Sequence, residues 1–217
     1  PLRLVGSEMC IRDRSFSNRN TLKFALLVLL LTLFLGCDNA VKNQMRFTNT
    51  DITGADFARD FELTSHDGKR VNLSHFEGKV VILFFGFMHC PDICPTTLTE
   101  LNGLMNTLGT DAQSVQVLFV TVDPERDKME NLASYMEVFN PDFLGLWGTS
   151  DEIETVTKEF KVIYQKVAGS TPDRYSVDHS AGTYVFDKNG KVRLFVPYGA
   201  DTESLTKDIR LLIDANT

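Results

Sequence analysis

Residues 80–98 have the sequence Val80-Val-Ile-Leu-Phe-Phe-Gly-Phe-Met-His-Cys-Pro-Asp-Ile-Cys-Pro-Thr-Thr-Leu98, and this stretch determines the architecture of the chain. Its first six residues are apolar without interruption, which predicts a buried β-strand that stops at Gly86. Cys90 and Cys94 follow with C-x-x-x-C spacing at a predicted helix start. Pro95 supports that start, because the first turn of a helix tolerates a residue without an N–H.

The two cysteines are predicted to form a reactive site. Thiols near a helix N-terminus lie close to the positive end of the peptide dipoles, which favours the thiolate. Residues four apart lie on one helical face, so both sulfurs can chelate one metal ion or oxidise to a disulfide. A static disulfide is a weaker alternative, because a bridge that closes so short a loop constrains the unfolded chain little.

Two active chemistries remain open from these residues. Dithiol–disulfide exchange needs an accessible thiolate and a resolving thiol, although its commoner spacing is C-x-x-C. Soft-metal binding is the other chemistry, because thiolates select Cu(I) and an added imidazole lets the same site hold Cu(II). A thiol peroxidase is a third and weaker alternative, because its attacking cysteine usually lies in a different kind of loop with an arginine nearby.

The first 37 residues are expected to lie outside the globular domain. Residues 1–14 show no helix or strand period and no initiator Met, so we interpret them, with Cys10, as a cloning or sequence-assembly artefact. Residues 15–37 carry basic residues followed by the twelve-residue segment Phe24–Leu35, which is apolar except for Thr32. Twelve residues fall short of the roughly 20 that span a bilayer as a helix. This pattern predicts a secretory signal peptide.

The end of this segment predicts how the chain is attached to a membrane. Leu33-Phe-Leu-Gly-Cys37 loosely matches a lipoprotein signal, which makes Cys37 a candidate for lipidation. An uncleaved membrane anchor and another form of processing are the alternatives. All three place the domain outside the cytoplasm, in the bacterial cell envelope or periplasm.

Composition limits what the exported part can be. Residues 1–36 hold five Lys/Arg and two Asp/Glu, so the 181 residues from Cys37 onward hold 17 and 27, a net charge of −10. This acidic balance argues against nucleic acid as a partner. After Cys37 only Cys90 and Cys94 remain, which excludes a disulfide-stapled scaffold. We expect a polar linker over 38–56 and one domain over 57–217.

Strand and helix patterns alternate from residue 57 onward. In order they predict a hairpin over 61–73, a strand over 80–85, a helix over 98–108, a strand over 116–122, helices over 128–139 and 149–160, a strand over 161–167, a loop over 168–174, a hairpin over 183–196 and a helix over 202–214. This order predicts an α/β domain with a central mixed sheet flanked by helices and an N-terminal β-hairpin extension. A cysteine motif between the first long strand and its helix indicates a thioredoxin-like fold.

His179 is the candidate third ligand. It lies in Ser176-Val-Asp-His-Ser-Ala-Gly-Thr183, just before the second predicted hairpin. In a thioredoxin-like domain this loop approaches the cysteine motif, and relatives of that fold place a cis-proline there. In this chain the loop contains a histidine and lacks a proline, so we predict that His179 binds the metal. The alternative is that His179 has a purely structural role. His89 is a rival ligand, but it precedes Cys90 directly, so we predict that it tunes or shields the site.

Three segments together resemble the Sco/SenC family. They are Gly86 to Pro95, Val120-Thr-Val-Asp-Pro-Glu-Arg-Asp127, and Val177-Asp-His179 ahead of Thr183-Tyr-Val-Phe-Asp187. The resemblance spans roughly residues 57–215 and implies a thioredoxin-like fold with Cys90, Cys94 and His179 as the three copper ligands. It also implies that Asp178 orients His179 or contributes a weak fourth contact.

Asp123 and Asp127 are predicted to serve turn formation and helix capping, and Asp123 is a further candidate to support the ligands. The family resemblance implies a membrane-tethered metallochaperone that delivers copper, as Cu(I) or Cu(II), to the copper-bearing subunit of a cytochrome c oxidase. Another copper chaperone is a candidate donor, and reduction of the acceptor's cysteines is a second implied role. On this interpretation the protein is not an enzyme in the turnover sense. The alternative is a thiol–disulfide oxidoreductase that acts on the cysteines of exported proteins.

Overall fold

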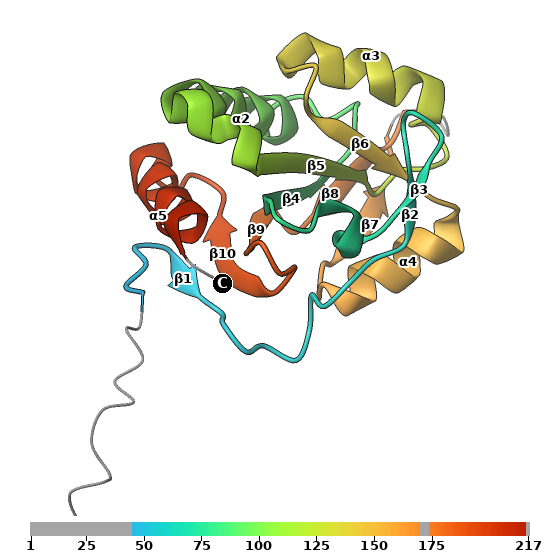
Figure 1. Cartoon of the computed structure of the whole chain (residues 1–217). Coiled ribbons are helices and arrows are strands. Elements are labelled where there is room, and N and C mark those ends of the chain that lie inside the picture. Colours follow the sequence, from blue (N-terminus) through green and yellow to red (C-terminus); the bar gives the residue numbers. More distant parts are fainter. Residues whose placement is uncertain (1–44, 170–173, 216–217) are drawn as a thin grey trace, which may run out of the picture. The chain divides into compact units, whose positions relative to one another are not determined.

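The computed structural model describes residues 45–169 and 174–215 (Figure 1). The predicted artefact, the signal peptide and the lipidation candidate Cys37 lie outside the described residues. Within the described ranges, no helix combines the length and the apolar character needed to cross a membrane.

The predicted strands and helices occur in the predicted order, and β1, β6 and β8 are additional strands. The strands are β1 (Thr50–Asp51), β2 (Leu63–Ser65), β3 (Arg70–Val71), β4 (Val80–Gly86), β5 (Val115–Thr121), β6 (Leu144–Trp147), β7 (Tyr164–Val167), β8 (Ser176–His179), β9 (Gly182–Phe186) and β10 (Val192–Pro197). The α-helices are α2 (Ile93–Leu108), α3 (Met129–Phe139), α4 (Ser150–Glu159) and α5 (Thr202–Asp214). Two 3-10 helices, η1 (Leu73–Phe76) and η2 (Gly109–Ser114), precede β4 and β5.

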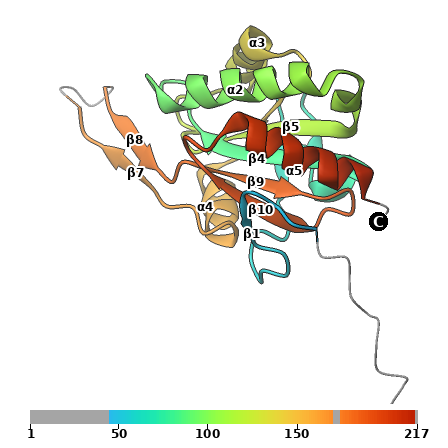
Figure 2. The ribbon, with the colours of Figure 1, turned by 90° about the vertical axis from the view of Figure 1, so that its left-hand side faces the viewer.

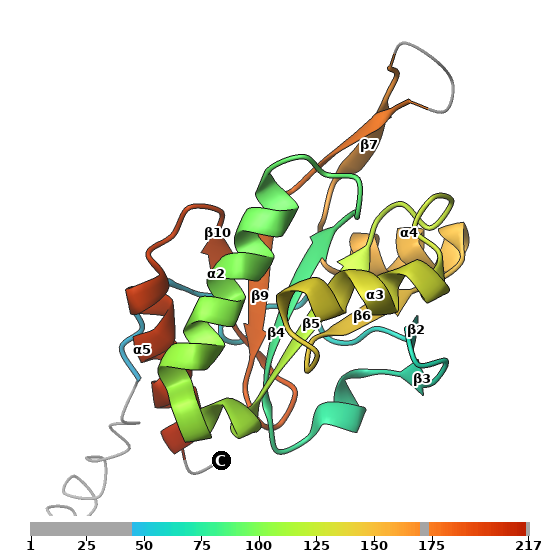
Figure 3. The same ribbon diagram turned by 90° about the horizontal axis from the view of Figure 1, so that it is seen from above.

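Eight strands form one mixed sheet in the order β1-β10-β9-β4-β5-β6-β2-β3 (Figure 3). β4 is parallel to β5 and β5 is parallel to β6, whereas β9 is antiparallel to β4. The β2–β3 hairpin pairs with β6 at one edge. The predicted central mixed sheet, its flanking helices and its N-terminal hairpin extension are therefore confirmed.

Helices cover both faces of the sheet (Figure 2), so alternate side chains of β4 pack into two layers of core. Phe84 contacts Phe119 of β5, which in turn contacts Tyr135 of α3 on the face that α2 and α5 also cover. Phe85 contacts Phe160, at the end of α4, on the opposite face. Every residue of β4 is buried, because helices cover both faces of the sheet.

Two predicted segments differ from the structure. The strand expected over 161–167 begins only at Tyr164, because Lys161 adopts a positive φ of 53° that ends the α4 segment. β7 then pairs with β8 in a separate two-stranded sheet, so His179 ends a strand that was expected to be part of a loop. The predicted loop over 168–174 falls partly outside the described residues.

The predicted linker over 38–56 is too long. β1 pairs with β10 through Thr50 and Asp51, so residues 45–56 lie on the domain. The buried carboxylate of Asp208 on α5 accepts hydrogen bonds from the backbone N–H groups of Thr48 and Asn49 at 2.8–3.1 Å. A carboxylate on a distant helix satisfies these N–H groups, and the local pattern of a polar stretch gives no sign of it.

We expect Asp208→Ala to lower the free energy of unfolding by about 1–3 kcal/mol, because it removes the hydrogen bonds that the backbone N–H groups of Thr48 and Asn49 donate to a charged carboxylate. Urea unfolding followed by circular dichroism measures the change. Asp214→Ala, at the exposed end of the same helix, is the matched control and should stay within about 0.5 kcal/mol. Equal stability of the two variants would show that the N-terminal segment contributes nothing to the domain.

Candidate metal centre

The cysteine turn joins β4 to α2. The N–H of Cys90 donates to the carbonyl of Phe87 at 3.2 Å, and α2 begins three residues later at Ile93. Cys90 therefore lies before the helix and not on its face, contrary to the prediction from spacing. The sulfurs still belong to one cluster, because the N–H of Cys94 donates to Sγ of Cys90 at 3.4 Å. Both residues are free thiols, Cys90 half-buried and Cys94 buried.

The pairing of β9 with β4 brings His179 to this turn. Thr183 lies opposite Phe84 in the antiparallel register, so the residues just before β9 lie at the carboxyl end of β4. Nε2 of His179 is 3.6 Å from Sγ of Cys94, across 85 positions of sequence. The structure thus places Nε2 of His179 against Cys94 and Sγ of Cys90 against the backbone of Cys94. Their role as copper ligands stays a prediction.

Hydrogen bonding assigns the tautomer of His179. Nδ1 lies 3.0 Å from the carbonyl oxygen of Ser180, which can only accept, so Nδ1 carries the hydrogen and Nε2 presents its lone pair to Cys94. Burial lowers the pKa of His179, and this keeps the ring neutral. Asp178 was expected to orient the ring. The Ser180 carbonyl does so instead, and Asp178 is exposed.

The thiol of Cys94 differs from the expected thiolate. Burial raises the pKa of Cys94 well above its usual range, and this effect exceeds the opposing effect of the hydrogen bond from the Phe87 backbone. The protonated thiol can donate to Nε2 of His179, which gives a neutral S–H···N pair. Metal binding at this pair has to release the thiol proton.

A close approach of backbone to sulfur makes this packing possible. A Cβ on Gly86 would lie 2.7 Å from Cε2 of Phe119 and 2.9 Å from Sγ of Cys94, so only glycine fits there. The rings of Phe84 and Phe87 stand nearly edge-on to His179, with centroids 6.4 and 5.9 Å from the imidazole. These aromatic rings shield the imidazole from water.

In the described part of the chain, no three His, Cys, Asp or Glu side chains are already grouped at metal-binding spacing. The Cys94–His179 pair is in place, and the half-buried Cys90 is the neighbouring donor that would complete a set of two sulfurs and one nitrogen. Such a set suits copper.

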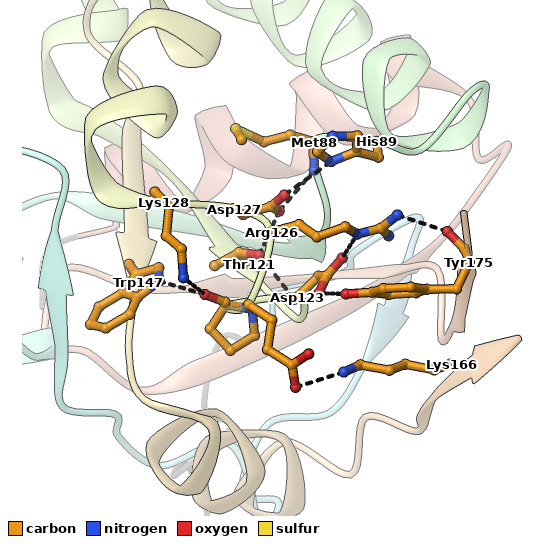
Figure 4. Close-up of polar contacts among 12 residues, drawn as sticks. Met88, His89, Thr121, Asp123, Arg126, Asp127, Lys128, Trp147, Lys166 and Tyr175 are labelled. Atoms are coloured by element: carbon orange, nitrogen blue, oxygen red, sulfur yellow. Dashed lines mark hydrogen bonds and ion pairs between the residues drawn. The ribbon is translucent and has the colours of Figure 1, made fainter. Parts of the chain in front are cut away.

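The remaining candidates point elsewhere (Figure 4). Nδ1 of His89 lies 3.4 Å from Oδ1 of Asp127, and its side chain is 54% exposed, so His89 is directed at Asp127. Asp123 is fully buried, and its carboxylate accepts from Nε of Arg126 at 2.6 Å and from the hydroxyl of Tyr175 at 2.7 Å. It belongs to a network with these two residues and does not contact the three candidate ligands directly.

Asp127 is the residue that the sequence prediction undervalued. Its buried carboxylate accepts from the N–H of Met88 at 2.9 Å and from the hydroxyl of Thr121 at 2.7 Å. It therefore holds the cysteine turn, where turn formation or helix capping was expected. The available signal was an acidic residue in a Pro-containing loop after a buried strand, and that signal does not distinguish these roles.

Residues 49–214 match the family model described as SCO1/SenC. The chain belongs to the SCO1/SenC family. A SCO2-like protein of Rickettsia conorii is 40% identical over 133 residues, 61% of this chain and 65% of that relative. The chain thus spans slightly less than two thirds of that curated relative. The predicted family resemblance is confirmed.

Two solved structures share the fold. Bradyrhizobium japonicum ScoI, solved with copper bound, is 33% identical with a TM-score of 0.67, over 72% of this chain and 99% of that one. Apo Sco1 from Thermus thermophilus is 39% identical with a TM-score of 0.68, over 78% and 99%. The predicted thioredoxin-like fold is confirmed.

The difference between the two thiols predicts their reactivity. In the reduced protein at neutral pH, we expect iodoacetamide to modify Cys90 more than about tenfold faster than Cys94, because the thiolate fraction falls tenfold for each unit by which a pKa rises. Peptide mapping by mass spectrometry at timed intervals measures both rates. In urea the two rates should converge, which serves as the control. Equal rates in the folded protein would contradict a buried, protonated Cys94.

Proposed function

We propose that this protein is a membrane-tethered copper chaperone that delivers copper to the dinuclear copper centre of a respiratory cytochrome c oxidase. The observation that supports this most is the 3.6 Å contact between Sγ of Cys94 and the unprotonated Nε2 of His179, beside the second thiol of Cys90. A neutral imidazole with its lone pair directed at a thiol is a donor pair for a soft metal, and a catalytic acid or base does not require it.

Copper is the cargo, held by Cys90, Cys94 and His179. Two thiolates favour Cu(I), and the imidazole allows Cu(II) as well. Both thiols lose their protons on binding, so the free energy of the new bonds has to exceed the cost of ionising the buried Cys94. Cys90 lies in a half-buried turn, where an incoming thiolate of an acceptor can approach the metal.

The redox state of the Cys90–Cys94 dithiol controls whether the protein can bind copper. The N–H of Cys94 donates to Sγ of Cys90 at 3.4 Å, so the sulfur of Cys90 already lies against the residue that would be its disulfide partner. Oxidation to a disulfide removes two electrons and two protons and eliminates both thiolate ligands. Only the reduced protein would then carry copper.

Relatives support the cargo. ScoI of Bradyrhizobium japonicum, at 33% identity, has been solved with copper bound, and so has yeast Sco1, at 32% identity. We extend copper binding to this chain on the donor set described above. The copper-bearing oxidase subunit as acceptor, another copper chaperone as donor, the lipidated Cys37 and the location outside the cytoplasm follow from the sequence and the family resemblance.

One observation favours a second function, thiol–disulfide exchange with exported proteins. The half-buried Cys90 accepts an N–H at the start of α2, while the buried Cys94 lies behind it. An accessible thiol in front of a buried one is the arrangement of an attacking and a resolving cysteine. In this reaction Cys90 would form a mixed disulfide with the substrate, and Cys94 would then release the reduced substrate.

Anaerobic Cu(I) titration against a chelator of known affinity tests the proposal. A reduced fragment beginning at Met45, the start of the compact unit, avoids Cys10 and Cys37. We expect one copper per chain, no tight binding in Cys90→Ser or Cys94→Ser, and a loss in His179→Ala of at least about tenfold, or about 1.4 kcal/mol. His89→Ala is the matched control and should bind as the parent does, because His89 is directed at Asp127.

Unchanged copper affinity in His179→Ala would refute the ligand set. Weak copper binding by the parent, together with rapid reduction of a protein disulfide that requires Cys90, would favour the oxidoreductase.

A further inference from the structure

The loop between β5 and α3, residues 122–128, contacts both segments that hold the candidate ligands (Figure 4). One segment is the turn that holds the two cysteines, and the other is the β7–β8 hairpin that ends at His179. Four charged residues of the loop make these contacts: Asp123, Glu125, Arg126 and Asp127.

Asp127 forms the contact with the cysteine turn. A single oxygen, Oδ2, accepts from the N–H of Met88 at 2.9 Å and from the hydroxyl of Thr121 at 2.7 Å. Thr121 ends β5 and lies opposite Gly86, the last residue of β4. The carboxylate therefore fixes the turn to the end of the sheet only two residues before Cys90.

Arg126 forms the contact with the hairpin. Its Nε donates to Asp123 at 2.6 Å, and its Nη1 donates to the carbonyl of Tyr175 at 2.8 Å. The guanidinium also stacks on the ring of Tyr175, 3.6 Å from the centroid. Tyr175 directly precedes β8, so this contact fixes the start of the strand that ends at His179.

Two further bonds close the hairpin network. The hydroxyl of Tyr175 donates to Oδ1 of Asp123 at 2.7 Å, and Nζ of Lys166 on β7 lies 2.7 Å from Oε1 of Glu125. The guanidinium of Arg126 also lies 5.9 Å from the ring of Phe87, and that ring contacts His179. The planar guanidinium of Arg126 makes this set of contacts possible, because a lysine cannot donate in two fixed directions while it stacks on a ring.

We propose that Asp127 and Arg126 are positioning residues, Asp127 for the dithiol turn and Arg126 for the hairpin of His179, so that one loop sets the geometry between the two halves of the metal site. This inference rests on the proposed copper-binding function. The two residues should therefore differ in which property their substitution changes, the copper affinity alone or also the midpoint potential of the dithiol. Arg126 bonds to the hairpin that carries the imidazole, whereas Asp127 bonds to the dithiol turn and thus also affects its oxidation.

Two quantities separate the roles, measured on the fragment from Met45, which contains the whole eight-stranded sheet and its core. The first is Cu(I) affinity, by competition with a chelator. The second is the midpoint potential of the Cys90–Cys94 couple in glutathione buffers. Urea unfolding confirms that each variant is folded.

For Arg126→Lys we expect copper affinity to fall about tenfold, the scale typical of residues that orient metal ligands, with the midpoint potential unchanged. Tyr175→Phe, which keeps the stacked ring and removes one hydrogen bond, is the milder variant and should lower affinity less. A shifted potential or an unchanged affinity in Arg126→Lys would overturn its role.

For Asp127→Ala we expect both the copper affinity and the midpoint potential to change. Asp127→Asn should recover most of both, because one amide oxygen can still accept from Met88 and Thr121. Equal defects in the two variants, or an unchanged potential in Asp127→Ala, would overturn the role of Asp127.

A double-mutant cycle excludes a merely structural effect. In a His179→Ala background, Arg126→Lys should cause no further loss of copper affinity. An equal loss in both backgrounds would show that Arg126 does not act through His179. If His179→Ala alone binds copper as the parent does, the ligand set and the role of Arg126 both fail, while the potential of Asp127→Ala still decides the role of Asp127.

Discussion

The buried contact between Sγ of Cys94 and Nε2 of His179 is the interaction on which the site depends. It exists because β9 pairs antiparallel with β4, which places the segment before β9 at the strand end where the cysteine turn begins. It also requires Gly86, since any side chain there would collide with the sulfur. The pairing of β4 with β9 therefore positions the candidate site as well as the core.

Burial gives the two thiols different tasks. Cys94 is held protonated beside a neutral imidazole, so the inner half of the site carries no net charge without metal. Cys90 lies in the half-buried turn and accepts the N–H of Cys94. Copper would therefore first meet the accessible thiol and then displace the proton of the buried one. The same order of access suits release to an acceptor thiol.

The sequence predicted the elements well because their signals are local. Continuous apolar runs identified β4 and β5, and the predicted helix over 149–160 begins with a capping box of Thr149 and Glu152. Cys90, Cys94 and His179 were found because a fold-level pattern joined them. The role of Asp127, the attachment of residues 48–49 to Asp208 and the β7–β8 pairing were missed. Each depends on partners distant in the sequence that no local pattern identifies.

X-ray absorption spectroscopy at the copper edge tests the central claim most directly. The Cu(I)-loaded, reduced fragment should show two sulfur ligands and one imidazole nitrogen, and His179→Ala should lose the nitrogen while it keeps both sulfurs. Coordination by two sulfurs alone in the parent would contradict the account. So would an imidazole signal that persists in His179→Ala and disappears in His89→Ala, because His89 would then be the nitrogen ligand.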